Sequence, residues 1–371
     1  MIPPHVDRNY SMDALRVLAM FMVVLLHMNG YTGLSKIPFD EYPVSRLLSS
    51  AERSFTFCAV NVYAMLTGYF CILSKQLKLE RYVRLWLLVA FYTVGLYIVF
   101  GVAARFLPGT IESPHMITKA LYPIPLASGY WYFNAYTIVF FMIPFMNHFL
   151  TQLSRIQYTQ FLLLVLFAVP GLQILGIETA WDAGYNPLWL AVLYCAGAYL
   201  RLYPLPIRRR WLIGGMSCMV AAMVALGFLT ASGASGSSYC MPQYVLMATC
   251  LMLFFSRTTI RAEKLCKLIS WSAPLAFSVY IIHLHPCIGS RIPKWVDMAG
   301  EYRLHWWFIP SASLALFMAC LLIDYCRLIL FRICRAEILV QWITRSCIRC
   351  YQSTVGKMFV LIEENTDDLQ K

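Results

Sequence analysis

Charged side chains are scarce in this sequence. Asp, Glu, Lys and Arg make up only 13% of its 371 residues, whereas 60% are hydrophobic, and the mean hydropathy is +0.63. A soluble globular domain carries about 25% charged residues, and a disordered chain is poor in hydrophobic residues. The composition therefore excludes a soluble domain, a disordered chain and a nucleic-acid-binding domain, although Lys and Arg outnumber Asp and Glu by 30 to 18.

In place of charge, the sequence has long apolar runs. A helix needs about 20 apolar residues to cross a bilayer. Ten runs can be marked: Ala14–Leu34, Phe55–Leu73, Leu85–Ala104, Tyr130–Leu150, Phe161–Gly176, Pro187–Leu202, Trp211–Ala231, Tyr239–Phe255, Ala273–Ser290 and Trp306–Leu330. We therefore predict an all-α, polytopic membrane protein with about ten transmembrane helices in a single domain over residues 1–330.

Lys and Arg are distributed unevenly over the connections between these runs. Cytosolic connections of membrane proteins carry an excess of Lys and Arg. With the N-terminus inside, the whole formal net charge of +12 falls on the cytosolic side. This predicts that both termini are cytosolic. Residues 331–371, which interleave Arg with Ile, Leu, Val and Trp, are interpreted as a basic amphipathic cytosolic tail on an anionic membrane surface.

Paired cysteine motifs are also lacking. Most of the 13 cysteines lie inside apolar runs, where a cysteine behaves as a small hydrophobic residue. Cys347 and Cys350 form a single C-x-x-C without a second pair or a neighbouring His. We therefore predict no metal site and no disulfide framework.

The first apolar run carries three ionisable residues, Asp13, Arg16 and His27. At about 100° per residue, Arg16 and His27 lie on one helix face, separated by roughly 16 Å along the axis, and Asp13 shares that face. Ionisable groups inside a membrane are expensive and usually functional. The alternative is that Asp13 and Arg16 form an interfacial ion pair, and that His27 is a hydrogen-bonding residue between helices.

Arg81 and Arg84 stand at i and i+3 before the third run and are predicted to face the same way. Two guanidinium groups on one face suit phosphate or pyrophosphate, although topology alone also explains arginines at this place. His283 and His285, two positions apart, would point about 200° from each other on a helix, so only one could face an interior cavity. Trp131, close to the outer end of its run, is typical of an interfacial aromatic belt or of a sugar site.

These residues carry a resemblance to a known family. The segment RNYSMDALRVLAMFMVVLLH resembles the first helix of the acyltransferase-3 family of integral membrane O-acyltransferases, with Asp13, Arg16 and His27 in register. The family's Arg-x-x-Arg is similar to the segment from Arg81 to Arg84. Thr67-Gly68-Tyr69 stands where the family usually has Ser-Gly-Tyr or Ser-Gly-Phe.

Three later segments extend the resemblance over nearly the whole chain. WYFNAYTIVFFMIP resembles a helix of the surface-polysaccharide acetyltransferase branch, and YCAGAYL resembles a recurrent glycine-containing helix. SVYIIHLHP is similar to a late motif of the family, with Tyr280 and His283 in register.

The resemblance implies transfer of an acetyl group from cytosolic acetyl-CoA to a sugar hydroxyl. The acceptor would be a surface polysaccharide or its lipid-linked precursor, and the location a bacterial-type inner membrane. His27 would act as general base or carry the acetyl group itself, while Asp13 and Arg16 organise the entry. Arg16, Arg81 and Arg84 are the candidates for binding the phosphates of CoA. The candidates for contacting the sugar are Trp131, Tyr132, Asn134, Tyr280 and His283.

On physical grounds alone, a transporter or exporter of a lipid-linked glycan or a small anion is the alternative. Buried His, Arg and Asp side chains suit a proton-coupled carrier equally well. Against it, no pair of interrupted segments occupies corresponding positions in two halves of the sequence. A non-catalytic scaffold in a polysaccharide assembly complex is a third possibility.

Overall fold

The computed structural model describes residues 8–74, 77–106, 129–174, 182–229, 238–350 and 352. Within these ranges every regular element is a helix and no strand occurs, which confirms the all-α prediction. The longer helices are α1 (Tyr10–Thr32), α2 (Pro43–Thr56), α3 (Ala59–Cys71), α4 (Leu79–Phe106), α6 (Trp131–Gln152), α7 (Arg155–Ile174), α8 (Pro187–Leu202), α9 (Arg209–Leu229), α10 (Pro242–Ser256), α11 (Glu263–Ser272), α12 (Ala276–His283) and α15 (Phe308–Ile333). The short elements are η1 (Leu34–Lys36), η3 (Asp182–Gly184), α13 (Pro286–Gly289), α14 (Ile292–Met298) and η4 (Gly300–Leu304).

Each of the ten predicted apolar runs coincides with a helix or a helix pair. Among the described residues, six helices are long and apolar enough to cross a membrane: α1, the joined α2 and α3, α4, α6, α9 and α15. A seventh is added if α11 and α12, which are bent by 44° at a short break, form one span. Three shorter apolar helices, Arg155–Val169 within α7 and the helices α8 and α10, match the remaining runs. The chain is therefore a multi-pass membrane protein, and its ten crossings stay a prediction.

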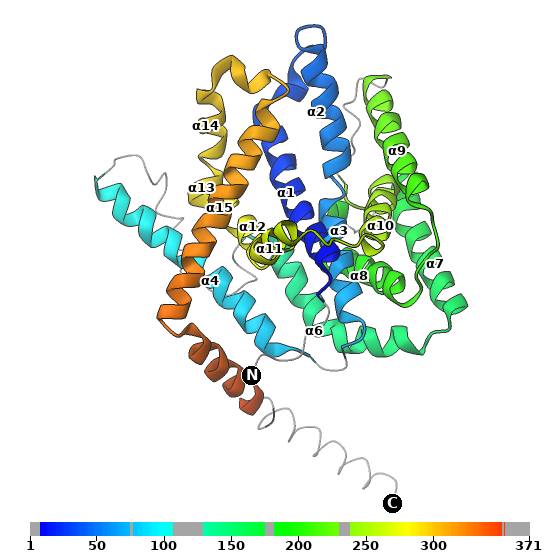
Figure 1. Ribbon diagram of the computed structural model, residues 1–371, viewed down its shortest axis with the longest axis vertical. Helices are drawn as coiled ribbons and strands as arrows, with labels where there is room; N and C mark the ends of the chain where they lie inside the picture. The colour runs from blue at the N-terminus through cyan, green and yellow to red at the C-terminus, as the bar shows by residue number, and fades with distance from the viewer. Residues whose placement is uncertain are drawn as a thin grey trace, which may run out of the picture.

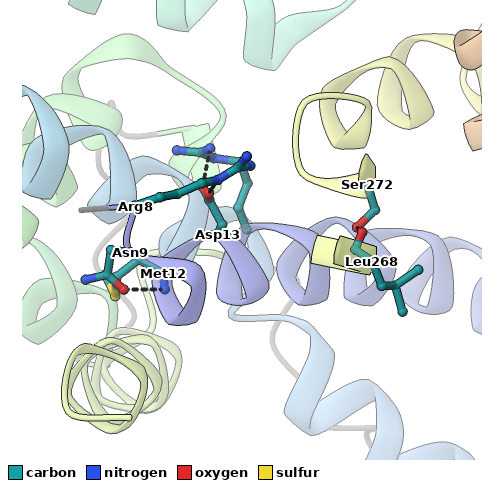
Figure 2. A network of polar contacts seen from close by, with 7 residues as sticks. Arg8, Asn9, Met12, Asp13, Leu268 and Ser272 are labelled. Atoms are coloured by element: carbon teal, nitrogen blue, oxygen red, sulfur yellow. Dashed lines mark hydrogen bonds and ion pairs between the residues drawn. The ribbon is translucent and has the colours of Figure 1, made fainter. Parts of the chain in front are cut away.

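Helix α1 lies at the centre of the bundle (Figure 1). It contacts α2, α3, α10, α11, α12, α14 and α15. Its start is capped by Asn9, whose side chain accepts a hydrogen bond from the backbone N–H of Met12 at 3.1 Å (Figure 2). It ends at Gly33, whose φ of 67° is the left-handed conformation common after a helix. Because so many helices surround α1, its polar side chains face protein rather than lipid.

Helices α3 and α8 pack backbone to backbone at two glycines. A Cβ atom at Gly197 would lie 1.9 Å from the backbone oxygen of Met65. A Cβ atom at Gly68 would lie 2.0 Å from the backbone oxygen of Tyr194. Small residues permit such close approach in membrane helices. The two glycine-containing segments that resembled the acyltransferase-3 family therefore meet in one helix crossing.

Replacing Gly197 with alanine is expected to destabilise the protein, because the added methyl group forces α3 and α8 apart. Overpacking of this kind costs about 1–3 kcal/mol and occasionally more. The matched control is Gly215→Ala in α9, where nothing lies within 4 Å of an added Cβ and the exchange is expected to be neutral or stabilising. Thermal unfolding of both purified variants in detergent gives the comparison. Equal midpoints for Gly197→Ala and the wild type would contradict the proposed role of the crossing.

Helix α12 ends at His283. Leu284 caps α12, and Pro286 starts α13. Helix periodicity predicted that only one of His283 and His285 faces an interior cavity; in the structure both side chains are fully buried. The prediction assumed a continuous helix through both residues, whereas the side chain of His285 caps α13 and accepts a hydrogen bond from the backbone N–H of Cys287 at 3.2 Å.

The predicted tail begins with a helix over residues 336–350, which follows α15 at the lower left of the view in Figure 1. Ile338, Leu339 and Trp342 are exposed on it, as expected of an amphipathic helix at a membrane surface. Arg327, near the end of the last apolar run, is buried inside α15, where its Nε atom lies 2.6 Å from Oδ1 of Asp324. Residues 353–371 lie outside the described ranges.

Candidate active site

His27 and His283 form a hydrogen-bonded dyad at the centre of the bundle. Nδ1 of His27 in α1 lies 2.9 Å from Nε2 of His283 in α12, and the ring centroids are 5.2 Å apart. His283 is fully buried, and its other ring nitrogen, Nδ1, lies 2.5 Å from the backbone oxygen of Val279. The two imidazoles come from positions 256 residues apart in the sequence.

The backbone oxygen of Val279 fixes the proton positions in this dyad. A carbonyl oxygen only accepts hydrogen bonds, so Nδ1 of His283 carries the proton. With both rings neutral, Nε2 of His283 then accepts a hydrogen bond from Nδ1–H of His27. This leaves Nε2 of His27 unprotonated and available as a base or a nucleophile. Both nitrogens of His283 are used within the protein, and we therefore propose that it orients His27 rather than contacting the sugar.

A cavity of about 40 Å³ lies beside His27. Its walls are mainly aromatic and aliphatic. Tyr132 is one of the lining residues, and its hydroxyl is buried and has no hydrogen-bond partner among the described residues. The lining residues include three of the predicted sugar contacts, Trp131, Tyr132 and Tyr280. They also include Tyr63, Phe277 and Tyr239, which the sequence did not single out. A buried hydroxyl without a partner is costly.

Asp13 and Arg16 form an ion pair one turn apart at the start of α1. Nη1 of Arg16 lies 3.0 Å from Oδ1 of Asp13, and Nε of Arg8 lies 2.7 Å from Oδ2 of the same carboxylate. Figure 2 shows Arg8 reaching Asp13 beside the capped helix start. The guanidinium of Arg16 also lies over the ring of Phe70, 5.2 Å from its centroid. Asp13 therefore neutralises part of the charge and orients Arg16 toward α3.

Three cations gather where α1, α3 and the start of α4 meet. Arg16, Lys78 and Arg81 all lie close enough to the Cys71 thiol to act on it electrostatically. Arg16 and Arg81 act in the same way on the hydroxyl of Tyr136. Arg81 is exposed, and no ion pair to it occurs within the described ranges. The structure thus places Arg16 and Arg81, two of the predicted phosphate ligands, near the same thiol, together with Lys78.

Arg84, the third predicted phosphate ligand, is engaged differently. Its Nη1 and Nη2 atoms each lie 2.5 Å from an oxygen of Glu337 in the tail helix, and Nη2 lies 2.6 Å from Oε1 of Glu80. The guanidinium fork is therefore filled by carboxylates, so Arg81 and Arg84 do not form the expected free pair. The reason is tertiary: Glu337 reaches Arg84 from 253 residues away.

Asn134 does not line the cavity beside His27. Its Oδ1 atom is buried without a hydrogen-bond partner in the described part of the chain. Among the described residues, no group of three or more His, Cys, Asp or Glu side chains is placed to hold a metal ion.

A second buried polar cluster joins α4 to α15. Nε and Nη2 of Arg327 lie 2.6 and 3.0 Å from the two carboxylate oxygens of Asp324, and the hydroxyl of Tyr92 donates to Oδ1 of Asp324 at 2.8 Å. Asp324 and Arg327 repeat the spacing of Asp13 and Arg16 in the last apolar run, a signal that could have revealed the pair. Neither Asp324 nor Arg327 lines the cavity beside His27, so we regard the cluster as structural.

Comparison with known proteins decides the family. The family model described as an acyltransferase domain, that of the acyltransferase-3 family, matches residues 9–325, which include both members of the dyad. The chain belongs to the acyltransferase-3 family. No curated protein and no solved structure matches it.

The residues that match the family model of this membrane acyltransferase therefore include His27, His283 and the residues that line the cavity. The match covers α1 to α14 and most of α15, and it favours an enzyme over the transporter and the scaffold considered from the sequence. The tail helix with Glu337 lies outside the matched residues. The contact between Glu337 and Arg84 is thus a feature of this chain beyond its family domain.

Proposed function

We propose that this acyltransferase moves an acetyl group from acetyl-CoA to a sugar hydroxyl of a surface polysaccharide or its lipid-linked precursor. The observation that carries the proposal is the His27–His283 dyad, which directs an unprotonated imidazole nitrogen away from His283, beside a cavity that His27 itself lines. A base held by a second group in the correct tautomer is the arrangement that activates hydroxyl nucleophiles in acyl transfer.

The donor would approach from the end of α1 that carries Arg16. CoA bears several phosphate groups, and guanidinium groups bind phosphate strongly. Arg16, Lys78 and Arg81 form a cationic corner in which Arg81 is exposed. On the predicted topology this corner faces the cytosol, where acetyl-CoA is made. The thioester would reach from there toward His27.

The size of the cavity supports a short acyl group. A cavity needs roughly 10–15 Å³ on this measure to hold one water molecule. The cavity beside His27 measures about 40 Å³, which corresponds to about three heavy atoms and hence to an acetyl group. A longer acyl chain would require the aliphatic wall, which includes Met20 and Val60, to move.

The proposed step is direct transfer. The sugar hydroxyl oxygen attacks the thioester carbonyl carbon while Nε2 of His27 takes the hydroxyl proton. The carbon–sulfur bond then breaks, and the proton passes from His27 to the leaving CoA sulfur. The products are the sugar acetate and CoA with a free thiol, and no other reactant is needed. Attack by His27 itself would instead produce an acetyl-imidazole, and ping-pong rather than sequential initial-rate kinetics would reveal it.

Membranes that contain the protein, radiolabelled acetyl-CoA and the lipid-linked glycan extracted from the producing cells provide the test. We expect acetyl-CoA-dependent label in the glycan. Replacing Arg81 with alanine is expected to raise the KM for acetyl-CoA by at least about tenfold, because one charged hydrogen bond contributes about 1.5–3 kcal/mol. Absence of label with the wild-type protein would overturn the proposal.

The control for the donor side is Lys267→Ala. Lys267 is 76% exposed and forms only a surface ion pair with Glu263, so its removal changes the charge without reaching the site. Its KM for acetyl-CoA is expected to equal that of the wild type. If the two variants raise this KM equally, the effect of Arg81 comes from the overall charge of the protein. That outcome would contradict the proposed contact between Arg81 and CoA.

A further inference from the structure

Three aromatic rings form a cluster at the cavity beside His27, and we call Trp131, Tyr185 and Tyr239 the aromatic rim. The ring centroid of Tyr185 lies 4.7 Å from that of Trp131 and 4.9 Å from that of Tyr239, and the remaining pair is 5.8 Å apart. Trp131 starts α6, Tyr185 follows η3, and Tyr239 precedes α10. Trp131 and Tyr239 line the cavity together with His27.

Hydrogen bonds hold the backbone of the rim in place. The backbone N–H of Tyr239 donates to the backbone oxygen of Ala183 at 2.8 Å, which ties the two loop segments together. Asn61 in α3 is fully buried, and its side-chain amide donates to the backbone oxygen of Tyr239 at 2.9 Å. The indole N–H of Trp189 in turn donates to Oδ1 of Asn61 at 3.3 Å.

The residue before Tyr185 is also fitted closely to the rim. Gly184 has a φ of +91°, and a Cβ atom at this position would lie 2.9 Å from both Trp189 and Cβ of Tyr239. Only glycine adopts this conformation without strain and leaves the necessary space. The loops that carry the rim are therefore held in place by Asn61 in α3 and Trp189 in α8.

The exposure of the rim differs from that of an interfacial aromatic belt. Tyr239 is 5% exposed and Tyr185 38% exposed, whereas Trp306 and Tyr302, near the start of α15, are 54% and 66% exposed. Belt residues stand in the membrane interface as single amphipathic side chains. The rings of the rim instead contact one another, and two of them, Trp131 and Tyr239, line the cavity. Tyr132 lines the same cavity, and its buried hydroxyl, which has no hydrogen-bond partner among the described residues, is a second and independent indication of a ligand.

We infer that the aromatic rim binds a pyranose ring of the acceptor by stacking. The C–H groups on one face of a pyranose carry partial positive charge, and the face of an aromatic ring carries partial negative charge. A sugar stacked on Trp131 and Tyr185 would place a hydroxyl toward His27, and the Tyr132 hydroxyl would gain a polar partner. On the predicted topology the rim lies on the side opposite the cationic corner, so donor and acceptor would reach His27 from opposite ends. The inference rests on the proposed function.

The test compares Tyr185→Ala with Tyr185→Phe in the acetyl-transfer assay. Loss of the ring is expected to raise the KM for the glycan about tenfold or more, whereas the phenylalanine variant, which keeps the ring, is expected to stay within about threefold of the wild type. The KM for acetyl-CoA is expected to be unchanged in both. The control for a belt effect is Trp306→Ala, which removes an exposed aromatic residue outside the rim and is expected to leave both constants unchanged.

A binding measurement separates this inference from the proposed function. The tritium-labelled lipid-linked glycan is titrated against the purified protein in nanodiscs, without acetyl-CoA. If the wild type binds the glycan and Tyr185→Ala binds it about tenfold more weakly, the result supports sugar binding by the rim, even when no acetyl group is transferred. If the wild type transfers acetyl and Tyr185→Ala keeps the wild-type KM and affinity for the glycan, the rim is overturned and the proposed function remains. Equal weakening by Tyr185→Ala and Tyr185→Phe would also overturn stacking, because the hydroxyl would then carry the effect.

Discussion

Acetyl transfer is expected to fall by about 10²–10⁴-fold when His27 is replaced by alanine, because a positioned general base contributes a factor of this size. The loss is expected in kcat, with little change in the KM for acetyl-CoA, since the cationic corner is left intact. Initial rates with radiolabelled acetyl-CoA provide the measurement. A variant that retains more than about a tenth of the wild-type kcat would contradict the role of His27 as base.

His283 provides the companion test, because we propose that it positions His27. His283→Leu removes the acceptor for Nδ1–H of His27 and is expected to lower kcat by at least about tenfold. His283→Gln offers an amide oxygen as acceptor and is expected to recover part of that loss. A merely structural role would not give this recovery, because both variants lose the ring that fills the site. Identical rates for the two variants, with equal thermal stability, would show that His283 does not act through the tautomer of His27.

Removal of the Asp324 carboxylate is expected to lower the free energy of unfolding by about 3–5 kcal/mol, the cost of leaving a buried charge unpaired. Asp324 is fully buried, and Arg327, its partner, is 8% exposed, so Asp324→Ala leaves a guanidinium group inside the bundle without its counter-ion. The hydroxyl of Tyr92 also loses its acceptor. Thermal or denaturant unfolding of the purified protein in detergent gives the measurement.

Two further variants show whether the effect belongs to the buried pair. Asp297→Ala breaks the ion pair with Arg303, in which the Asp297 side chain is 63% exposed, and is expected to cost about 0–1 kcal/mol. The double variant Asp324→Leu with Arg327→Met removes both charges and is expected to recover most of the stability lost in Asp324→Ala. If Asp324→Ala is no less stable than Asp297→Ala, the cluster does not stabilise the contact between α4 and α15.

Much of the fold follows from local properties of the sequence. Apolar runs longer than about 15 residues form helices in a membrane because every backbone polar group must be satisfied within the segment. For this reason the ten runs coincide with helices. The alignment of Asp13, Arg16 and His27 follows in the same way from helix geometry within α1. The resemblance to the acyltransferase-3 family rests on these local spacings, and the family match confirms it.

The end of α12 and the contacts between distant segments do not follow from local properties of the sequence. The predicted directions of His283 and His285 assumed one continuous helix. In the structure α12 ends between the two residues, and both side chains are buried. The expected fork of Arg81 and Arg84 did not anticipate Glu337, which comes from the tail. Periodicity fixes which side chains share a face of one helix, but it carries no information on what lies opposite that face.

The sequence by itself determined that this protein is an all-α membrane protein with His27 on its first helix, and the match to the family model identified it as an acyltransferase. Only the tertiary structure paired His27 with His283, buried Arg327 against Asp324, and brought Tyr185 and Tyr239 to Trp131. The physical reason is that these contacts depend on how closely the helices approach. That distance is set by packing, as at Gly68 and Gly197, where the absence of two methyl groups lets α3 and α8 meet.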